Sequence, residues 1–381
     1  MNKLRVLVVE DSLTVRRRFC EILAADPELE VVGEAEDGKR AIELCEALRP
    51  DIITLDMAMP VMSGLNATEY IMAYMPTPIL IVSASTNRGE LFETYDALAA
   101  GAVDVLEKPS IDDVDEVWER RFVAAVKLIA SIKVITHPRA RLRGNEGTFA
   151  RARQDLVTAP QDSVTAPQEP LTAPPAIPRH QQRGRDLGVL AIGTSTGGPQ
   201  AIVNVLRALP QGLQAPFLLV LHIDEPFGVA FAKWLDSQTP HRVAYARDGE
   251  PIDSLRGQVV MAPPGRHLTV GGRRLQLRAD PPRHSCRPSV DVLFESLAAD
   301  CGADVLACLL TGMGRDGAAG LLAIRKAGGC TLAQDESTSV VYGMPREAVS
   351  LGAAQMILPL DQIGGKIVQL LGAANGERHE R

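Results

Sequence analysis

The stretch "LLTGMGRDGAAG" (309–320) decides the fold class, because three glycines join an apolar run to a helical pattern. Gly312, Gly314 and Gly317 spell G-x-G-x-x-G, and Asp335 follows near the position of the ribose-binding acid in dinucleotide-binding domains. That fingerprint normally belongs to the first βαβ unit of a domain, whereas several strand candidates come before it here. A dinucleotide site and another use of the glycines are therefore both open at this point.

The same alternation of short apolar strands and amphipathic helices extends through two regions of the chain. It predicts an α/β fold class with two doubly wound, mostly parallel-sheet domains. Strands are expected at 5–9, 30–34, 51–55, 78–82 and 102–106 in the first domain, and at 187–192, 216–221, 258–262 and 304–310 in the second, with a hairpin around Gly271 and Gly272.

The apolar periodicity disappears between the two regions. The segment there is rich in Pro, Ala, Thr, Gln and Arg, and three related heptapeptides each contain a proline, which excludes a coiled coil. This composition predicts a flexible linker. The expected domains are therefore 1–136, a linker at 137–186, and 187–375.

The composition excludes several classes of protein. The net charge is −7 over 381 residues, so there is no general attraction to nucleic acid. The six cysteines include no C-x-x-C pair, which argues against a zinc site or a disulfide framework and fits a reducing cytoplasm. No stretch approaches the roughly 20 apolar residues of a membrane span. We therefore expect a soluble, cytoplasmic protein with no nucleic-acid partner and no insertion into the membrane.

Charged and polar side chains follow four strands of the first domain. Glu10 and Asp11 follow the first strand, Asp56 the third, Ser83 the fourth and Lys108 the fifth. Carboxylates that converge at one sheet edge can bind Mg²⁺, and a lysine there can pair with a phosphoryl group. Taken singly, Asp11 could cap a helix and Lys108 could be a surface charge. Only the whole set points to phosphoryl chemistry.

The motifs "VVEDS", "TLDMAMPVMSGL", "VSAST" and "EKP" resemble the receiver domain of two-component response regulators, over about residues 3–133. The resemblance implies that Asp56 is the phospho-acceptor and that Ser83 and Lys108 contact the phosphoryl group. It implies as ligands for Mg²⁺ the side chains of Glu10, Asp11 and Asp56 and the carbonyl of Ala58. Val105 stands where many receivers carry a switching Tyr or Phe. The usual aromatic rotamer switch is therefore not expected.

A second glycine motif opens the C-terminal domain. "AIGTSTGGPQ" (191–200) contains G-x-S-x-G around Ser195, between a strand and a helix expected to open at Pro199. Such a turn can expose a nucleophilic serine hydroxyl, bind a phosphate, or simply be tight.

A histidine and an acid complete a candidate triad. His222 follows the next strand, and Asp316 lies within the glycine-rich loop 309–320. The chain order is Ser, His, Asp, and triads are recognised by geometry rather than by order. In this interpretation the glycines let a tight loop bring Asp316 close to Ser195. A structural histidine is the alternative for His222 alone.

The motifs "AIGTSTGGPQAI", "LH", "MAPPGRH", "RPSVDVLFESLA", "LLTGMGRDGAAGL" and "VYGMPREA" resemble the catalytic domain of chemotaxis protein-glutamate methylesterases, over about 187–373. The resemblance implies Ser195 as nucleophile, His222 as general base and Asp316 as its orienting partner. It also implies an oxyanion hole formed by Met313 and by the turn after Ser195, at Thr196. One departure is "HIDEPFG" (222–228), which puts the contacts at the rim of the substrate site in doubt.

With its receiver, the whole chain resembles a phosphorylation-activated methylesterase. The implied substrates are methylated glutamates of methyl-accepting chemoreceptors, the implied product is methanol, and deamidation of receptor glutamine is implied as a second activity. A chemotaxis histidine kinase would donate the phosphoryl group, Mg²⁺ would serve only the receiver, and ester hydrolysis would need no cofactor. We expect the unphosphorylated receiver to cover the Ser195 cleft, with inhibition weakened by the long linker.

Two rival functions are weighed against this prediction. A response regulator with a nucleic-acid-binding output would need a compact helix-turn-helix pattern and a basic recognition helix, which the C-terminal sequence lacks. An NAD-linked enzyme would use the glycines of 309–320, and a cofactor titration tests it.

Overall fold

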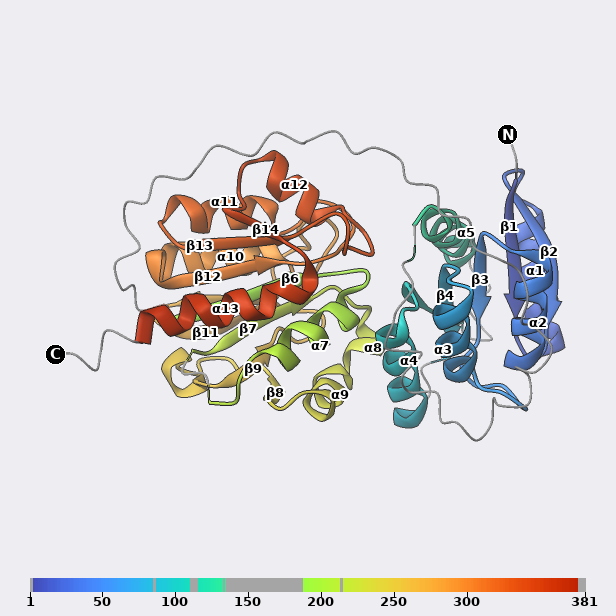
Figure 1. Cartoon of the computed structure of the whole chain (residues 1–381), viewed down its shortest axis with the longest axis horizontal. Helices are drawn as coiled ribbons and strands as arrows, with labels where there is room; N and C mark the ends of the chain where they lie inside the picture. Colours follow the sequence, from blue (N-terminus) through green and yellow to red (C-terminus); the bar gives the residue numbers. More distant parts are fainter. Residues whose placement is uncertain are drawn as a thin grey trace, which may run out of the picture.

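A computed structural model describes residues 3–84, 87–109, 116–132, 134, 188–212 and 215–375. Two α/β domains lie side by side, with the N-terminal domain at the right of Figure 1 and the C-terminal domain at the left. The predicted linker 137–186 and its heptapeptides lie outside the described residues. Within the described part of the chain, no helix is both long enough and apolar enough to cross a bilayer.

The N-terminal domain is a five-stranded parallel sheet with the strand order β2-β1-β3-β4-β5. Its strands are β1 (Leu4–Val9), β2 (Leu29–Ala35), β3 (Ile52–Leu55), β4 (Ile79–Ser83) and β5 (Asp104–Glu107). Its helices are α1 (Leu13–Ala24), α2 (Gly38–Leu48), α3 (Gly64–Tyr74), α4 (Arg88–Ala100) and α5 (Glu116–Ala130). The five strands predicted for this domain are confirmed to within two residues at each end.

Local sequence explains where these helices begin. The side chain of Asp37 caps α2 by accepting a hydrogen bond from the backbone N–H of Arg40. The side chain of Asn87 caps α4 by accepting one from the backbone N–H of Glu90. Each cap satisfies one of the N–H groups that a helix leaves unpaired at its start. The β1 and β3 side chains are almost wholly buried, as expected for central parallel strands covered on both faces.

The C-terminal domain is a seven-stranded parallel sheet with the order β14-β13-β12-β6-β7-β9-β8. Its strands are β6 (Val189–Thr194), β7 (Phe217–Leu221), β8 (Arg242–Tyr245), β9 (Gln258–Met261), β12 (Val305–Leu309), β13 (Cys330–Gln334) and β14 (Met356–Leu358). Its α-helices are α7 (Gly198–Ala208), α8 (Glu225–Gly228), α9 (Phe231–Gln238), α10 (Val290–Asp300), α11 (Ala318–Lys326), α12 (Met344–Ser350) and α13 (Leu360–Asn375).

The order of the strands positions the site. β6 comes first in the domain but lies in the middle of the sheet, between β12 and β7. Chain connections diverge from such a strand, which opens a crevice at its carboxyl end. The predicted hairpin is confirmed as the antiparallel pair β10 (His267–Gly271) and β11 (Arg274–Arg278).

The two domains share a buried apolar contact. Tyr95 of α4 is fully buried, its ring lies 5.2 Å from that of Phe231 and 5.5 Å from that of Trp234, and its hydroxyl donates to the carbonyl of Phe227. Trp234 Nε1 in turn donates to the carboxylate of Asp96 at 2.8 Å. In Figure 1, α4 accordingly lies against the other domain, where it contacts α7, α8 and α9. The two domains therefore pack against each other through α4 of the N-terminal domain.

Candidate active site

Ser195 and His222 lie at the carboxyl ends of neighbouring strands. Thr194 of β6 pairs with Leu221 of β7, and the N–H of His222 donates to the carbonyl of Thr194 at 3.1 Å. The N–H of Ser195 donates to Thr311 at 3.1 Å, in the loop that follows β12. Three adjacent strands thus bring the two predicted residues and the glycine-rich loop to one sheet edge.

The glycines of 309–320 serve close packing. A Cβ added to Gly312 would lie 2.8 Å from Ser195 Cβ and 2.4 Å from Met344 Sδ, so a side chain there would displace the serine. Gly317 has φ +87°, a left-handed conformation that favours glycine, and begins α11. The loop can therefore pass directly against Ser195, and it carries Asp316 to its contact with His222.

The Asp335 carboxylate has local partners that favour a structural role over the dinucleotide interpretation. It accepts hydrogen bonds from the N–H of Thr338 at 3.1 Å and from the hydroxyl of Ser337 at 2.6 Å. These bonds close the turn after β13. The strand before the glycines is also not the first of its domain.

The Asp316 carboxylate is almost fully buried, at the N-terminus of α10. Its oxygens accept hydrogen bonds from the N–H of Val290 at 2.7 Å, the N–H of Asp291 at 3.2 Å and the hydroxyl of Ser289 at 2.7 Å. Burial alone would raise the pKa of this carboxyl, but His222 and these donors outweigh it and lower the pKa. The group is therefore held as an anion at neutral pH.

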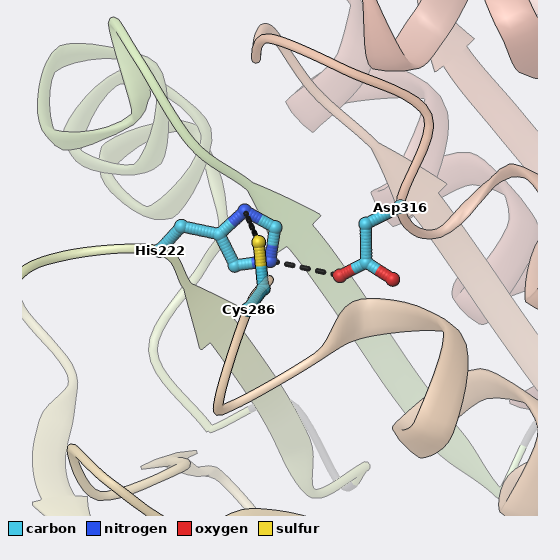
Figure 2. A group of neighbouring side chains, drawn as sticks. All are labelled: His222, Cys286 and Asp316. Atoms are coloured by element: carbon cyan, nitrogen blue, oxygen red, sulfur yellow. Dashed lines mark hydrogen bonds and ion pairs between the residues drawn. The ribbon is translucent and has the colours of Figure 1, made fainter. Parts of the chain in front are cut away.

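The imidazole of His222 has a different partner on each nitrogen, as Figure 2 shows. Nε2 lies 2.8 Å from Asp316 Oδ2, and Nδ1 lies 3.6 Å from Cys286 Sγ. Burial opposes the charged ring, yet the hydrogen bonds to Asp316 and Cys286 raise the pKa of His222 to about 9. Because the carboxylate accepts the proton of Nε2, Nδ1 is the nitrogen that carries the lone pair when the ring is neutral.

A cavity of about 480 Å³ lies between the domains, and both Ser195 and His222 line it. The receiver contributes Asp104 and Arg121 to the same wall. Thr196, the residue after Ser195, donates its hydroxyl to Asp104 at 3.2 Å, and burial raises the pKa of Asp104 to about 6. The N-terminal domain therefore forms part of the wall of the cavity that Ser195 and His222 line.

Two residues expected at an oxyanion hole lie on the loops beside Ser195. Thr196 follows it in the β6–α7 turn, and Met313 lies in the glycine-rich loop with its side chain 49% exposed. The Thr311 hydroxyl joins these two loops by donating to the carbonyl of Thr196 at 3.0 Å. Their role as oxyanion donors stays a prediction.

The receiver holds a second cluster of charged groups. Lys108 Nζ lies 2.8 Å from Glu10 Oε2 and 2.9 Å from Asp56 Oδ2, so it is not the surface charge of the alternative interpretation. Burial raises the pKa of Glu10 to about 7 and raises that of Asp56, while Lys108 opposes both shifts. Ser83 is buried at the end of β4, next to this edge.

The receiver cluster fits Mg²⁺. Oxygens of Glu10, Asp11 and Asp56 all lie within 4.8 Å of one another, and carboxylate oxygens are the ligands that this hard cation prefers. Asp11 does not cap α1, since Ser12 is the N-cap residue. Ala58 is exposed in the loop after β3, and its carbonyl as a ligand stays a prediction.

Sequence reasoning missed two neighbours of the triad. Cys286 carries no spacing signal, because its contact with the triad is to His222, which is distant in sequence, and its other hydrogen bond is to the backbone carbonyl of His284. Ser289 lies in the quoted motif "RPSVDVLFESLA", and a serine before an apolar helical run is an N-cap signal that could have identified it.

Comparisons with known proteins identify the family of each domain. Residues 190–367 match the CheB methylesterase family, and residues 6–118 match the response regulator receiver domain. A protein of Anaeromyxobacter dehalogenans is 42% identical to this chain, and the match covers 94% of this chain and 95% of that protein. A protein of Nitrosospira multiformis is 40% identical, and the match covers 98% of both chains. Both are named protein-glutamate methylesterase/protein-glutamine glutaminase.

A solved structure also resembles the C-terminal domain. The CheB methylesterase catalytic domain of Thermotoga maritima is 33% identical, with a TM-score of 0.46 over 48% of this chain and 98% of that one. The relatives named above match nearly the full chain, including both domains. This chain therefore belongs to the receiver-linked CheB methylesterase family.

Proposed function

We propose that this chain hydrolyses γ-methyl esters of glutamate on methyl-accepting chemoreceptors, with Ser195, His222 and Asp316 as the catalytic triad. The observation that carries the proposal is the His222–Asp316 hydrogen bond of 2.8 Å in the cavity that Ser195 lines. Asp316 fixes the ring so that Nδ1 is available as the base.

The reaction follows from this geometry in two halves. Ser195 Oγ attacks the ester carbonyl carbon while His222 Nδ1 takes its proton, and the N–H groups of Thr196 and Met313 stabilise the oxyanion. The proton then passes to the departing methoxide, which leaves as methanol. Water attacks the acyl-serine with His222 again as base, giving glutamate and free serine. With a glutamine side chain, ammonia leaves instead of methanol.

The receiver regulates access to this chemistry. Its α4 and β5 lie against the catalytic domain, and Asp104 contacts the residue next to Ser195. A histidine kinase would transfer a phosphoryl group to Asp56, where Lys108 and Ser83 contact it and Glu10, Asp11 and the Ala58 carbonyl hold Mg²⁺. Bound Mg²⁺ would offset the negative charge of the phosphoryl group. Phosphorylation then shifts the population toward separated domains with an open cavity.

A methanol-release assay on methylated chemoreceptor fragments tests the proposal. We expect the full chain to release methanol, and to do so faster with a small phosphoryl donor and Mg²⁺. Ser195→Ala should fold normally and release none. Turnover by Ser195→Ala at the wild-type rate would exclude Ser195 as nucleophile, and no turnover by the phosphorylated wild type would exclude this substrate.

A further inference from the structure

We propose that His284 is a positioning residue for the proposed reaction. Its side chain links the glycine-rich loop 309–320 to the N-terminus of α10, and these two segments hold the triad acid Asp316. His284 is not among the residues that line the cavity, so it acts on the chemistry through its neighbours. The effect on turnover rests on the proposed function, whereas the link itself rests on the contacts of His284 alone.

His284 lies in a tight turn that its own sequence does not favour. The N–H of Arg283 donates to the carbonyl of Cys286 at 3.1 Å and the N–H of Cys286 donates back at 2.8 Å, which closes a two-residue hairpin turn. The two residues inside the turn, His284 and Ser285, have φ angles of 52° and 64°. Both angles lie in the left-handed region, where turns of this kind normally have asparagine, aspartate or glycine. Contacts outside the turn must therefore stabilise it.

The imidazole of His284 has one contact on each nitrogen. Arg315, the residue before Asp316 in the glycine-rich loop, donates from Nε to Nδ1 at 3.3 Å. Nε2 lies 3.2 Å from Oδ2 of Asp291, which is in the first turn of α10. Because Nδ1 accepts a hydrogen bond, the proton of the neutral ring is on Nε2, the nitrogen nearer to the carboxylate. The side chain therefore bridges the loop and the helix.

Asp291 belongs to the support of the triad acid. It is fully buried, its Oδ1 accepts the N–H of Gly320 at 2.7 Å, and its own N–H donates to Asp316 at 3.2 Å. Its other carboxylate oxygen, Oδ2, is nearer to His284 than to the guanidinium of Arg283, which lies 3.7 Å away. A buried carboxylate oxygen needs a donor, so removal of the imidazole should loosen Asp291 and with it the contacts of Asp316.

Several parts of the active site depend on this bridge. The glycine-rich loop carries Asp316, which contacts His222, and Met313, the proposed oxyanion donor. The turn itself places Cys286 against the ring of His222, with Sγ 3.6 Å from Nδ1 (Figure 2). A misplacement of reacting groups by about 1 Å can cost about a hundredfold in rate, even when the changed residue is remote from the chemistry. Loss of the bridge should therefore lower kcat and leave KM little changed.

The kinetics of methanol release by the phosphorylated full chain test the bridge. Glycine adopts the left-handed conformation freely, so His284→Gly removes the side chain without straining the turn. We expect kcat to fall at least about tenfold and KM to change less than about twofold. His284→Asn should recover much of kcat, because asparagine tolerates positive φ and its amide oxygen can accept from Arg315 in place of Nδ1. A kcat of His284→Gly within about twofold of the wild-type value would overturn the proposal.

Arg273→Gly is the matched control. Arg273 also has a positive φ, 55°, in the turn between β10 and β11, and its guanidinium binds the carboxylate of Asp253 at 2.6 and 3.1 Å. Its N–H donates to Asp300, the last residue of α10, at the opposite end of the helix from the triad acid. Both variants lose a side chain that pairs with a carboxylate, but only His284→Gly should lower kcat. An equal loss of kcat in both would mean that reduced stability, not position, slows the reaction, and would overturn the positioning role.

Hydrogen exchange measures the bridge independently of activity. Two amides report on it, because the N–H of Gly320 donates to Asp291 at 2.7 Å and the N–H of Ala318 donates to the carbonyl of Arg315 at 3.2 Å. We expect His284→Gly to speed exchange in the glycine-rich loop relative to wild type, and Arg273→Gly to leave it unchanged. Unchanged exchange in His284→Gly would overturn the bridge. Faster exchange in His284→Gly, together with a wild type that releases no methanol, would refute only the proposed function.

Discussion

At the scale of single residues, His222 determines the direction of proton transfer. Asp316 contacts Nε2, so the proposed base is Nδ1, the nitrogen that also faces Cys286. The carboxylate stabilises the imidazolium that forms when Ser195 loses its proton. The same stabilisation is present before the reaction and raises the pKa of His222 to about 9.

We therefore expect the apparent pKa on the acid side of the pH profile of kcat/KM to be higher than the ordinary imidazole pKa of about 6.5. Below the raised pKa of His222 the ring is protonated and cannot accept a proton, so the rate should fall about tenfold per pH unit. The stability of the fold depends on pH in the opposite direction. His222 stabilises the folded state fully at pH values below its pKa in the unfolded chain, and this contribution is lost as the pH rises through its folded-state pKa of about 9. NMR titration of His222 in the Ser195→Ala protein measures the pKa directly.

Asp316→Asn provides the comparison in the same background. The amide cannot stabilise the imidazolium as a carboxylate does, so the pKa of His222 should move down. A His222 resonance that titrates at the same pH in both proteins would contradict the role assigned to Asp316.

The predictability of individual residues depends on whether a local pattern marks them. Ser195 lies in a glycine-flanked turn and Asp316 in a glycine-rich loop, and the structure brings both to the sheet edge that holds His222. Cys286 has no such pattern. Its position depends on the path of the loop before α10, which packing rather than local sequence determines.

At the scale of secondary structure, the N-terminus of α10 is what keeps Asp316 in place. Two backbone N–H groups and the hydroxyl of Ser289 bind the carboxylate, and Ser289 Oγ also accepts the N–H of Val292 as the helix N-cap. Buried anions are stable where helix N–H groups and the helix dipole converge. The N-terminus of α10 therefore has two roles: it starts a helix that packs in the core, and it orients the Asp316 carboxylate.

Ser289→Ala should reduce kcat by about 10- to 100-fold, because a hydrogen bond to a charged group contributes about 1.5–3 kcal/mol. It should also destabilise the fold by about 1 kcal/mol through loss of the cap. Methanol release and denaturant unfolding measure the two effects. Retention of the hydroxyl in Ser289→Thr should restore much of kcat.

Ser63→Ala is the matched control for this change. Ser63 caps α3 in the receiver, where its hydroxyl accepts the N–H of Asn66 far from the triad. Both variants lose an N-cap, but in the unphosphorylated protein only Ser289→Ala should slow the chemistry. Equal losses of kcat would show that Ser289 acts through stability alone.

The elements that sequence reasoning missed lie mostly at the edges of the C-terminal sheet. β8 (Arg242–Tyr245) and β14 (Met356–Leu358) are short, carry exposed positions and form the two edges, so neither has the continuous apolar run of a buried strand. β13 is buried but ends in polar Gln334, whose side chain accepts the N–H of Thr311. Central strands such as β6 and β12 were predictable because both of their faces are apolar.

At the scale of the whole molecule, the aromatic contact between the receiver and the catalytic domain comes from α4 rather than from a residue at position 105. Val105 is buried, lines the cavity and has no ring to switch. Tyr95 provides the aromatic contact, packed against Phe231 and Trp234. Sequence alone did not predict this contact, because an aromatic residue on the inner face of a helix is normally part of its own domain's core.

Tyr95→Leu should raise the rate of the unphosphorylated enzyme toward the phosphorylated rate. The change removes an aromatic contact and the hydrogen bond to Phe227, together about 2 kcal/mol, which corresponds to about a 30-fold change in the ratio of closed to open molecules. Leucine keeps an apolar side chain, so the receiver should still fold. Methanol release without a phosphoryl donor measures the effect.

The same substitution in an Asp56→Asn background separates domain contact from phosphorylation. If Tyr95 holds the domains together, the double variant should remain as active as Tyr95→Leu alone, because opening no longer requires the phosphoryl group. Tyr70→Leu is the control, since Tyr70 packs on Tyr74 of α3, with ring centroids 4.8 Å apart, and should leave the basal rate low. An unchanged basal rate in Tyr95→Leu would mean that the aromatic contact does not restrain the domains, and that Asp104 with Arg121 closes the cavity instead.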